Sequence, residues 1–238
     1  VYTFSAKSDS ASLTARDIRL APSGVRFCAL EEGELVRVKT NLPGQFSVYN
    51  ALAAISCARL LGVSLADAAA ALETAHGAKG RVEPVPTDGD YSIFIDYAVT
   101  PDAIENVLTT LRGIAPKRLV MLFGAGGDRD RKKRPIMGKL SADIADFVIV
   151  TSDNPRTEDP MSIIEEILPG VRAGKAPYKV ICDRPEAIRW AIDHHEPGDV
   201  ILLCGKGHED YQIIGHEKIH MDEREIVADY LAERAKRT

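Results

Sequence analysis

Hydrophobic and polar positions alternate in short runs over residues 1–40. Turn residues separate the runs, with Pro22-Ser23-Gly24 between the second and third and Gly33 between the third and fourth. Alternation with a period of two, broken by Gly and Pro, is typical of β-hairpins. The pattern therefore predicts four short strands, at Val1–Ser5, Asp17–Leu20, Val25–Leu30 and Leu35–Val38.

The period then changes to that of a helix. Apolar side chains recur with helical spacing over residues 48–61, and a second, Ala-rich helix is predicted at Leu65–Leu72. The segment that follows, 76–80, is small and polar, which favours a linker. We therefore expect a domain boundary near Gly80, between a unit of residues 1–80 and one of residues 81–238.

Short apolar runs and helical segments alternate over the rest of the chain. This alternation predicts a mostly parallel sheet with helices on both faces, a Rossmann-like α/β fold. Thr100-Pro101 and Asp159-Pro160 are helix starts, and Asp183 with Glu186 and Asp222 with Glu225 have capping-box spacing. Strands are predicted at Ser92–Tyr97, Arg118–Phe123, Phe147–Thr151, Lys179–Cys182 and Val200–Cys204, and helices around Pro101–Leu111, Arg134–Ala142, Pro160–Leu168, Pro185–His194 and Asp222–Arg237.

The loop after the Arg118 strand is rich in glycine. In open α/β sheets ligands bind at the carboxyl ends of the strands, so the loops at those ends are the candidates for chemistry. The glycines of 124–127 allow backbone N–H groups to approach an anion, but Arg129 stands where a dinucleotide fingerprint needs Gly. Arg129 opens a basic run to Arg134 and is the candidate for binding a carboxylate or phosphate. The alternative is a solvated, charged helix start.

The loop after the Phe147 strand offers both signs of charge. Asp153 is suited to a cationic amine, and Arg156 to a carboxylate held through two parallel hydrogen bonds. Pro155 stiffens the loop and pushes Asn154 towards extended geometry. Opposite charges in one loop fit a zwitterionic amino acid. The alternative is a turn that leads into a capped helix.

The loop after the Val200 strand reads Gly205-Lys206-Gly207-His208-Glu209. Its glycines permit close backbone approach, Glu209 is suited to a second amino group, and His208 is either an acid–base residue or structural. It is not a phosphate-binding loop, because no Gly lies five positions before Gly205 and no Ser or Thr follows Lys206.

Three further polar residues have chemistry suited to a nucleotide. Asp96 can accept hydrogen bonds from a ribose, Asn50 can pair with an adenine edge, and Arg81 can meet a phosphate. Helix capping or surface solvation explains each of them equally well.

Composition narrows the classes of partner. The 238 residues carry a net charge of −5, and no run approaches the roughly 20 apolar residues of a membrane span. The acidic balance argues against nucleic acid or an anionic membrane as the main partner. The four cysteines form no CxxC pair, so we expect reduced core cysteines of a cytoplasmic protein rather than a zinc site or disulfides. Because the first residue is Val1, we expect the chain to begin inside a longer protein.

A set of segments, taken together and in order, resembles one family. The segments are Gly44–Ala54, Gly80–Glu83, Asp96–Ala98, Thr100-Pro101, Gly126–Asp130, Asp153–Arg156 and Gly205–Glu209. They resemble the ATP-dependent Mur ligases, in particular the members that add meso-diaminopimelate, over nearly the whole chain. The resemblance implies that residues 1–80 end the central ATPase domain and residues 81–238 form the C-terminal domain. The N-terminal domain, the phosphate-binding loop and the family's carbamylated lysine would lie outside this chain.

The resemblance also implies a reaction and its participants. Such ligases join meso-diaminopimelate to UDP-N-acetylmuramoyl-L-alanyl-D-glutamate through an acyl phosphate, with ATP and Mg²⁺. We expect a cytoplasmic monomer, and a chain that is inactive alone, with no catalytic residue or metal ligand assigned in it. The Asp-Asn-Pro-Arg motif is the family's mark of diaminopimelate selection. By the resemblance, Arg129, Asp153, Asn154, Pro155, Arg156, Gly205 and Glu209 bind the amino acid, and Asn50, Arg81 and Asp96 lie on the nucleotide side.

One position departs from the family pattern, and two other functions stay open. The family commonly has His after Asp-Tyr-Ala, where this chain has Val99, a side chain that cannot contact a phosphate or polarise the site. A related ligase that adds lysine or glutamate is one alternative, and Arg156 and Glu209 argue against it. A non-catalytic amino-acid-binding module is the other.

Overall fold

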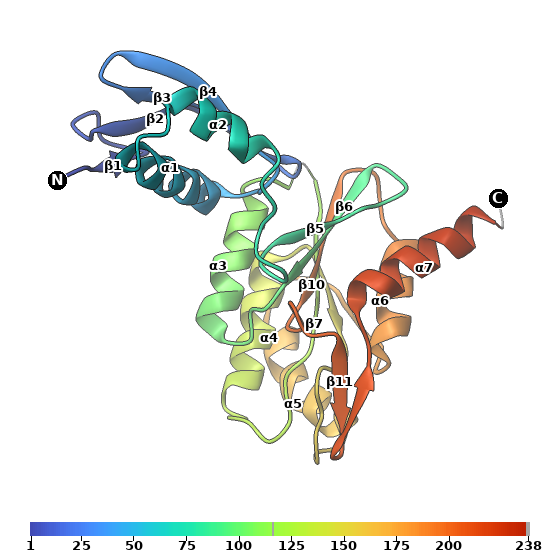
Figure 1. The fold of residues 1–238 in the computed structure, drawn as a ribbon. Coiled ribbons are helices and arrows are strands. Elements are labelled where there is room, and N and C mark those ends of the chain that lie inside the picture. Colours follow the sequence, from blue (N-terminus) through green and yellow to red (C-terminus); the bar gives the residue numbers. More distant parts are fainter. Residues whose placement is uncertain (116, 237–238) are drawn as a thin grey trace. The chain divides into compact units, whose positions relative to one another are not determined.

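The computed structural model describes residues 1–115 and 117–236 and divides the chain into two compact units (Figure 1). The first unit is Val1–Gly77 and the second is Ala78–Thr238, so the division falls close to Gly80. Each unit has its own buried apolar core. The predicted end of the last helix at Arg237 lies outside the described residues.

Four strands form one sheet in the first unit, in the order β1 (Phe4–Ser5), β2 (Leu13–Ala21), β3 (Gly24–Glu31) and β4 (Glu34–Thr40). The two predicted hairpins, β2-β3 and β3-β4, are confirmed as antiparallel pairs, whereas β1 is parallel to β2. β2 begins at Leu13, before the predicted start at Asp17, and contains a bulge, since Asp17 has a positive φ of 51° and the register shifts between Arg16 and Arg19. This bulge interrupts the alternation from which the strand was predicted.

Two helices cover the apolar face of this sheet. The helices α1 (Gln45–Leu60) and α2 (Leu65–Glu73) share a core with the strands, in which Leu52 and Ile55 join Phe27 and Val38. Ser64 caps α2, because its hydroxyl accepts a hydrogen bond from the backbone N–H of Asp67 at 3.0 Å. Both helices match the sequence pattern, since helical spacing places their apolar side chains on one face.

A six-stranded sheet forms the centre of the second unit, in the order β5-β6-β10-β7-β8-β9. The five strands predicted from apolar runs are confirmed and are parallel to one another. The edge strand β5 was not predicted, because it contains Pro84, which lacks a backbone N–H and is tolerated only at a sheet edge. The bounds are β5 (Glu83–Val85), β6 (Tyr91–Asp96), β7 (Leu119–Phe123), β8 (Phe147–Val150), β9 (Tyr178–Val180) and β10 (Asp199–Cys204).

Helices cover both faces of this sheet, which confirms the Rossmann-like α/β architecture. On one face lie α3 (Pro101–Arg112), α4 (Lys133–Ile144) and α5 (Pro160–Ala173), and on the other lie α6 (Arg184–Asp193) and α7 (Glu223–Ala235) (Figure 1). The parallel strands β6, β7, β8 and β10 are buried on both faces, which explains why their sequences are continuous apolar runs, whereas the edge strand β9 is largely exposed.

The predicted helix caps are present, with one difference in detail. Thr100, Asp159 and Asp183 each accept a hydrogen bond from the backbone N–H three residues later. Asp222 accepts from the N–H of Arg224 instead of that of Glu225, so its capping geometry is one residue shorter than predicted.

A hairpin lies between β10 and α7 and was not predicted. Its strands are β11 (Tyr211–Ile214) and β12 (Glu217–His220), which pair antiparallel around Gly215, whose φ is 61°. The strands are short, and β12 is exposed along its length, so neither produces an apolar run.

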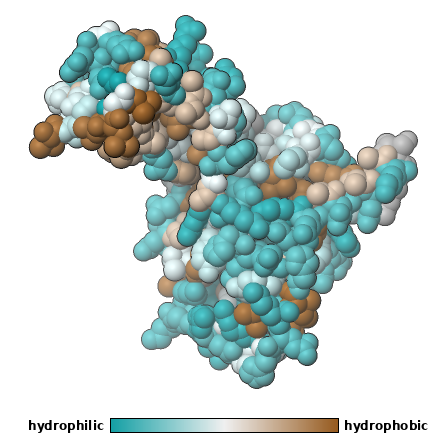
Figure 2. Space-filling model, viewed as in Figure 1, coloured by the Kyte–Doolittle hydropathy of each residue, from teal (hydrophilic) through white to brown (hydrophobic). Residues whose placement is uncertain are grey.

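Polar residues cover most of the visible face of the second unit (Figure 2). No helix in residues 1–115 and 117–236 is both long and apolar enough to cross a membrane. The expectation of core cysteines holds for Cys204 and is wrong for Cys57, which is exposed on α1.

The helices α4 and α5 cross closely because each presents a glycine at the contact. A Cβ added to Gly138 would lie 2.5 Å from the carbonyl oxygen of Ile167. A Cβ added to Gly170 would overlap the carbonyl oxygen of Pro135. These two glycines allow one backbone to approach the other where a side chain would separate the helices.

We expect Gly170→Ala to destabilise the second unit, even though Ala favours a helix by about 1 kcal/mol over Gly. Moving α4 away from the new methyl group should cost about 1–3 kcal/mol, the range for overpacked sites. Urea unfolding followed by the fluorescence of Trp190, the single tryptophan, measures this directly, because Trp190 lies in α6. The control is Gly113→Ala, where φ is −65° and the nearest atom is at 3.4 Å. An unchanged midpoint for Gly170→Ala would contradict the close crossing.

Candidate functional site

Loops from neighbouring strands meet at the carboxyl end of the parallel sheet. They follow β6, β7, β8 and β10, and β10 lies between β6 and β7 in the sheet. Together they line a pocket of about 120 Å³ that lies entirely within the second unit. The lining residues are Tyr97, Val99, Gly126, Arg129, Lys133, Asp153, Asn154, Arg156, Gly205 and Glu209.

The pocket brings together nearly all of the residues that the sequence assigns to the amino acid. Arg129, Asp153, Asn154, Arg156, Gly205 and Glu209 all line it, although they come from three separate loops. Pro155 is the exception, because it is buried behind the pocket against Gly127.

The glycines after β7 bring two loops into contact. The backbone N–H of Gly127 donates to the carbonyl oxygen of Asn154 at 2.9 Å, and a Cβ on Gly127 would overlap the carbonyl oxygen of Pro155. A Cβ on Gly126 would lie 2.9 Å from Nη1 of Arg156. The sequence suggested that these glycines expose N–H groups to an anion; the structure shows that they allow the loop after β7 to pack against the loop after β8.

Asn154 links three segments through its side-chain amide. Its Oδ1 accepts hydrogen bonds from Nζ of Lys206 at 2.8 Å and from the backbone N–H of Ile213 at 2.9 Å. Its Nδ2 donates to Oε2 of Glu209 at 2.9 Å. The residue is 4% exposed, so most of its hydrogen-bonding capacity is used inside the protein.

Two carboxylates give the pocket its negative charge. Asp153 is 5% exposed, and a Cβ on Gly205 would lie 2.5 Å from its Oδ2, so Gly205 leaves space for this carboxylate. Burial alone would raise the pKa of Glu209, but the hydrogen bonds from Lys206 and Asn154 outweigh it and place the pKa below its ordinary value. Glu209 is therefore charged at neutral pH and suited to an amine.

Arg156 has an unusual backbone that other segments hold in place. Its φ is 53°, a left-handed value that a residue with a side chain adopts only when its surroundings fix it. Its N–H donates to the carbonyl oxygen of Ile213 at 3.0 Å, and its own carbonyl oxygen accepts from Gly215 at 2.7 Å. The hairpin β11-β12 thus holds Arg156, whose Nη1 also donates to the carbonyl oxygen of Gly127 at 2.8 Å.

The basic run after β7 divides into buried and exposed cations. Arg134 is fully buried and bonds both oxygens of Glu158 at 2.8 and 2.9 Å, so this part of the run is not a solvated helix start. Lys133 donates to the carbonyl oxygen of Val99 at 2.8 Å, and burial lowers its pKa. Arg129 is exposed at the rim of the pocket.

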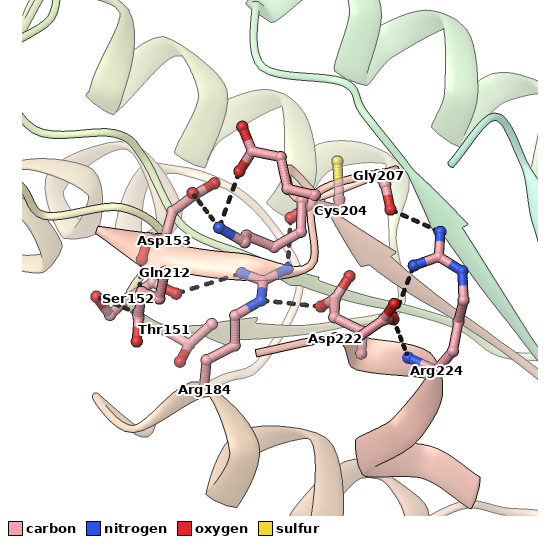
Figure 3. Close-up of polar contacts among 12 residues, drawn as sticks. Thr151, Ser152, Asp153, Arg184, Cys204, Gly207, Gln212, Asp222 and Arg224 are labelled. Carbon is pink, nitrogen blue, oxygen red and sulfur yellow. Dashed lines mark hydrogen bonds and ion pairs between the residues drawn. The ribbon is translucent and has the colours of Figure 1, made fainter. Parts of the chain in front are cut away.

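A buried ion pair lies beneath the loops after β8 and β10 (Figure 3). Nε of Arg184 donates to Oε1 of Glu223 at 2.9 Å, and both side chains are fully buried. The other guanidinium nitrogens donate to the carbonyl oxygens of Ser152 at 3.3 Å and Cys204 at 2.8 Å. Arg184 therefore ties the ends of β8 and β10 to α6 and α7.

Sequence reasoning missed two cations of this region. Lys206 was considered only as a phosphate-binding lysine, yet its place between two glycines at a strand end was the available signal. Arg184 gave no signal, because it follows Asp183 at the start of a helix and resembles an ordinary first-turn residue.

The three nucleotide candidates are placed differently. Asp96 is buried and accepts a hydrogen bond from the N–H of Val82 at 2.9 Å, and burial raises its pKa. Arg81 is exposed, with its guanidinium 5.4 Å from the centre of the Tyr97 ring. Asn50 is exposed on α1 in the first unit. Their nucleotide role stays a prediction.

Two further features limit the chemistry. His208 is exposed, and its ring centre lies 5.0 Å from that of Tyr97, with the two rings tilted by 47°. Among the residues that the structure describes, no group of three or more His, Cys, Asp or Glu side chains is arranged to hold a metal ion.

Comparison with protein families gives two matches. Residues 80–207 match the model described as the Mur ligase, glutamate ligase domain, and residues 1–58 match that of the Mur ligase middle domain. The first match covers the strands whose loops form the pocket and every lining residue except Glu209.

Two curated relatives and one solved structure share the same protein name. A UDP-N-acetylmuramoyl-L-alanyl-D-glutamate–2,6-diaminopimelate ligase of Caldanaerobacter subterraneus subsp. tengcongensis is 48% identical over 99% of this chain and 48% of its own length. One from Trichormus variabilis is 46% identical over 99% of this chain and 48% of its own length. A solved structure with the same name aligns with a TM-score of 0.81 and 34% identity, over 98% of this chain and 48% of that one. The chain spans about half the length of the relatives it matches.

We expect Arg184→Met to lower the free energy of unfolding of the second unit by about 3–5 kcal/mol, because it leaves the Glu223 carboxylate buried without its cation. The fluorescence of Trp190 during urea unfolding measures the change. Arg189→Met is the matched control on the same helix, since Arg189 is exposed; its guanidinium lies 5.8 Å from the centre of the Tyr230 ring, so its loss should cost no more than about 1 kcal/mol. Equal effects of the two substitutions would show that the buried pair does not hold the loops.

Proposed function

The chain belongs to the Mur ligase family, and we propose that it carries the amino-acid site of a ligase that adds meso-diaminopimelate to UDP-N-acetylmuramoyl-L-alanyl-D-glutamate. In this proposal, residues 1–80 end the central ATPase domain and residues 81–238 form the C-terminal domain. ATP and Mg²⁺ take part in the reaction, and the protein acts as a cytoplasmic monomer. The names of the relatives support the choice of substrates.

The observation that carries the proposal is the pairing of opposite charges in one pocket. Asp153 and Glu209 supply carboxylates, and Arg129, Lys133 and Arg156 supply cations. Meso-diaminopimelate has an ammonium and a carboxylate at each end, so it matches both signs. A ligand with a single type of charge would leave half of these groups unpaired, which costs affinity.

Arg156 is the group that distinguishes diaminopimelate from lysine. Lysine lacks the second carboxylate, so Arg156 would face it without a partner. A guanidinium binds a carboxylate through paired, charge-assisted hydrogen bonds, which are stronger than bonds between neutral groups. Its backbone is held at a left-handed φ, so the position is set before the ligand arrives.

The part that the second unit plays in the reaction is binding and orientation. It holds the amino group that forms the new bond close to the carboxylate that receives it, and such positioning contributes much of the rate of a two-substrate reaction. The exposed guanidinium of Arg81 beside Tyr97 fits a phosphate, and Asp96 fits an acceptor role on the nucleotide side. In the described part of the chain, no three or more His, Cys, Asp or Glu side chains are grouped to hold a metal ion.

A non-catalytic amino-acid-binding module is the second candidate. Its support is that every residue lining the pocket belongs to the second unit, so the pocket does not require the first. A ligase that adds lysine or glutamate instead has less support, since it would leave Arg156 or Glu209 without a counterpart.

Calorimetric titration of the chain with meso-diaminopimelate and with lysine tests the proposal. We expect diaminopimelate to bind more tightly than lysine, and Arg156→Ala to remove the difference. Loss of a charge-assisted hydrogen bond, about 1.5–3 kcal/mol, corresponds to a roughly ten- to hundredfold weaker binding of diaminopimelate. Lys132→Ala is the control, because Lys132 is exposed in the same basic run but does not line the pocket.

Two outcomes would change the assignment. Tighter binding of lysine, or equal binding of both ligands by the parent chain, would contradict diaminopimelate selection. If diaminopimelate binds as expected, a protein extended to the length of the relatives should release phosphate from ATP only when both substrates are present. Binding without such release would favour the non-catalytic module.

A further inference from the structure

We propose that Lys206 is a positioning residue of the amino-acid site, which orients Asn154 and Glu209 so that one oxygen of Glu209 is presented to an amine of the ligand. The inference rests on the proposed function for the identity of the ligand. The arrangement of the three side chains is independent of it.

The burial of Lys206 requires that its charge be used inside the protein. The side chain has no exposed surface. An isolated ammonium in such a place would be very costly, so its position is determined by its partners. They are Oδ1 of Asn154 at 2.8 Å and Oε2 of Glu209 at 2.9 Å, with Oδ1 of Asp153 at 3.9 Å.

Lys206 fixes the direction of the Asn154 amide. An ammonium only donates hydrogen bonds, so the atom of Asn154 that faces it must be the oxygen. The nitrogen of the amide then points to Glu209, to which it donates at 2.9 Å. If the amide were reversed, its nitrogen would face the ammonium of Lys206, so two donors would meet. Glu209 would then lose the hydrogen bond from Asn154.

The same contacts leave the two oxygens of Glu209 in different states. Oε2 accepts from both Lys206 and Asn154, so it is saturated and immobile. Oε1 has a longer bond, to the hydroxyl of Tyr211 at 3.3 Å. Since Glu209 lines the pocket, Oε1 is the oxygen available to an incoming amine.

Lys206 also keeps Glu209 charged next to a second carboxylate. Lys206 and Tyr211 contact Glu209 directly, and burial by itself would favour the protonated form. The other titratable or charged groups that line the pocket with Glu209 are Tyr97, Arg129, Lys133, Asp153 and Arg156. Without Lys206, the cost of burial would act with less opposition and raise the pKa of Glu209.

The test compares Lys206→Met with Lys218→Met. Both lysines lie over the ring of Tyr211, at 5.2 and 3.5 Å, but Lys218 is exposed on β12 and does not line the pocket. Carboxyl carbon NMR measures the titration of Glu209 in the absence of ligand. In the parent and in Lys218→Met the pKa should lie below the ordinary 4.5, and in Lys206→Met it should lie above it.

Binding provides the second readout. Calorimetry with meso-diaminopimelate should show about tenfold weaker binding at pH 7 for Lys206→Met, which corresponds to about 1.4 kcal/mol. Its loss of affinity on acidification should begin at a higher pH than in the parent, because Glu209 protonates earlier. If Lys206 had only a structural role, its substitution would lower the melting temperature without changing the pH at which affinity begins to fall.

Several results would overturn the inference. One is a folded Lys206→Met with the parent's Glu209 pKa, affinity and pH profile. If that variant does not fold, the parent decides the question, and a Glu209 that titrates at or above 4.5 rejects the inference. Failure of the proposed function looks different: the parent itself would not prefer diaminopimelate, while the Glu209 titration would still report on Lys206.

Discussion

The burial of two cations at the carboxyl end of the sheet determines how this region is built. Lys206 and Arg184 have no exposed side-chain surface, so each must have its charge and its hydrogen bonds satisfied internally. Arg184 does so through Glu223 and the carbonyl oxygens of Ser152 and Cys204, which holds the ends of β8 and β10. Lys206 does so through Asn154 and Glu209, which line the pocket. Arg184 therefore fixes the strand ends, and Lys206 fixes the side chains of Asn154 and Glu209 in the loops that follow them.

Backbone contacts between the loops and the β11-β12 hairpin also hold the pocket residues in place. The loop after β7 packs directly against the loop after β8, since Gly127 leaves no side chain between them. The hairpin β11-β12 forms hydrogen bonds with both the backbone of Arg156 and the side chain of Asn154. Arg156 can then keep a left-handed φ that would otherwise be unfavourable, because hydrogen bonds to the hairpin and to the loop after β7 hold it in place. Pre-ordering of this kind reduces what a ligand must supply on binding.

Much of the fold follows from local sequence patterns, because each pattern has a local physical cause. The runs at β6, β7, β8 and β10 are apolar because both faces are buried, and Asp159 and Asp183 cap helices through bonds that span three residues. The bulge at Asp17, the edge strand around Pro84 and the β11-β12 hairpin were not predictable in this way. The bulge breaks the alternation of β2, Pro84 is unusual in a strand, and β12 is exposed along its length, so none of the three leaves a regular apolar pattern.

The candidate site likewise contains residues that the sequence predicted and residues that it missed. Residues such as Asp153, Arg156 and Glu209 were predicted because charge next to Gly or Pro at a strand end indicates a ligand, and the structure places them in one pocket. Arg184 was missed because a sequence does not show whether a cation points to solvent or into the protein, and Lys206 was missed although its place between two glycines at a strand end was a signal. The groups that line the pocket thus have a signature in the sequence, while the burial of the two cations is visible only in three dimensions. For this pocket, the residues predicted to bind the ligand and the buried cations that hold the strand ends and the side chains of Asn154 and Glu209 are different residues, and only the structure identifies the contacts of the second group.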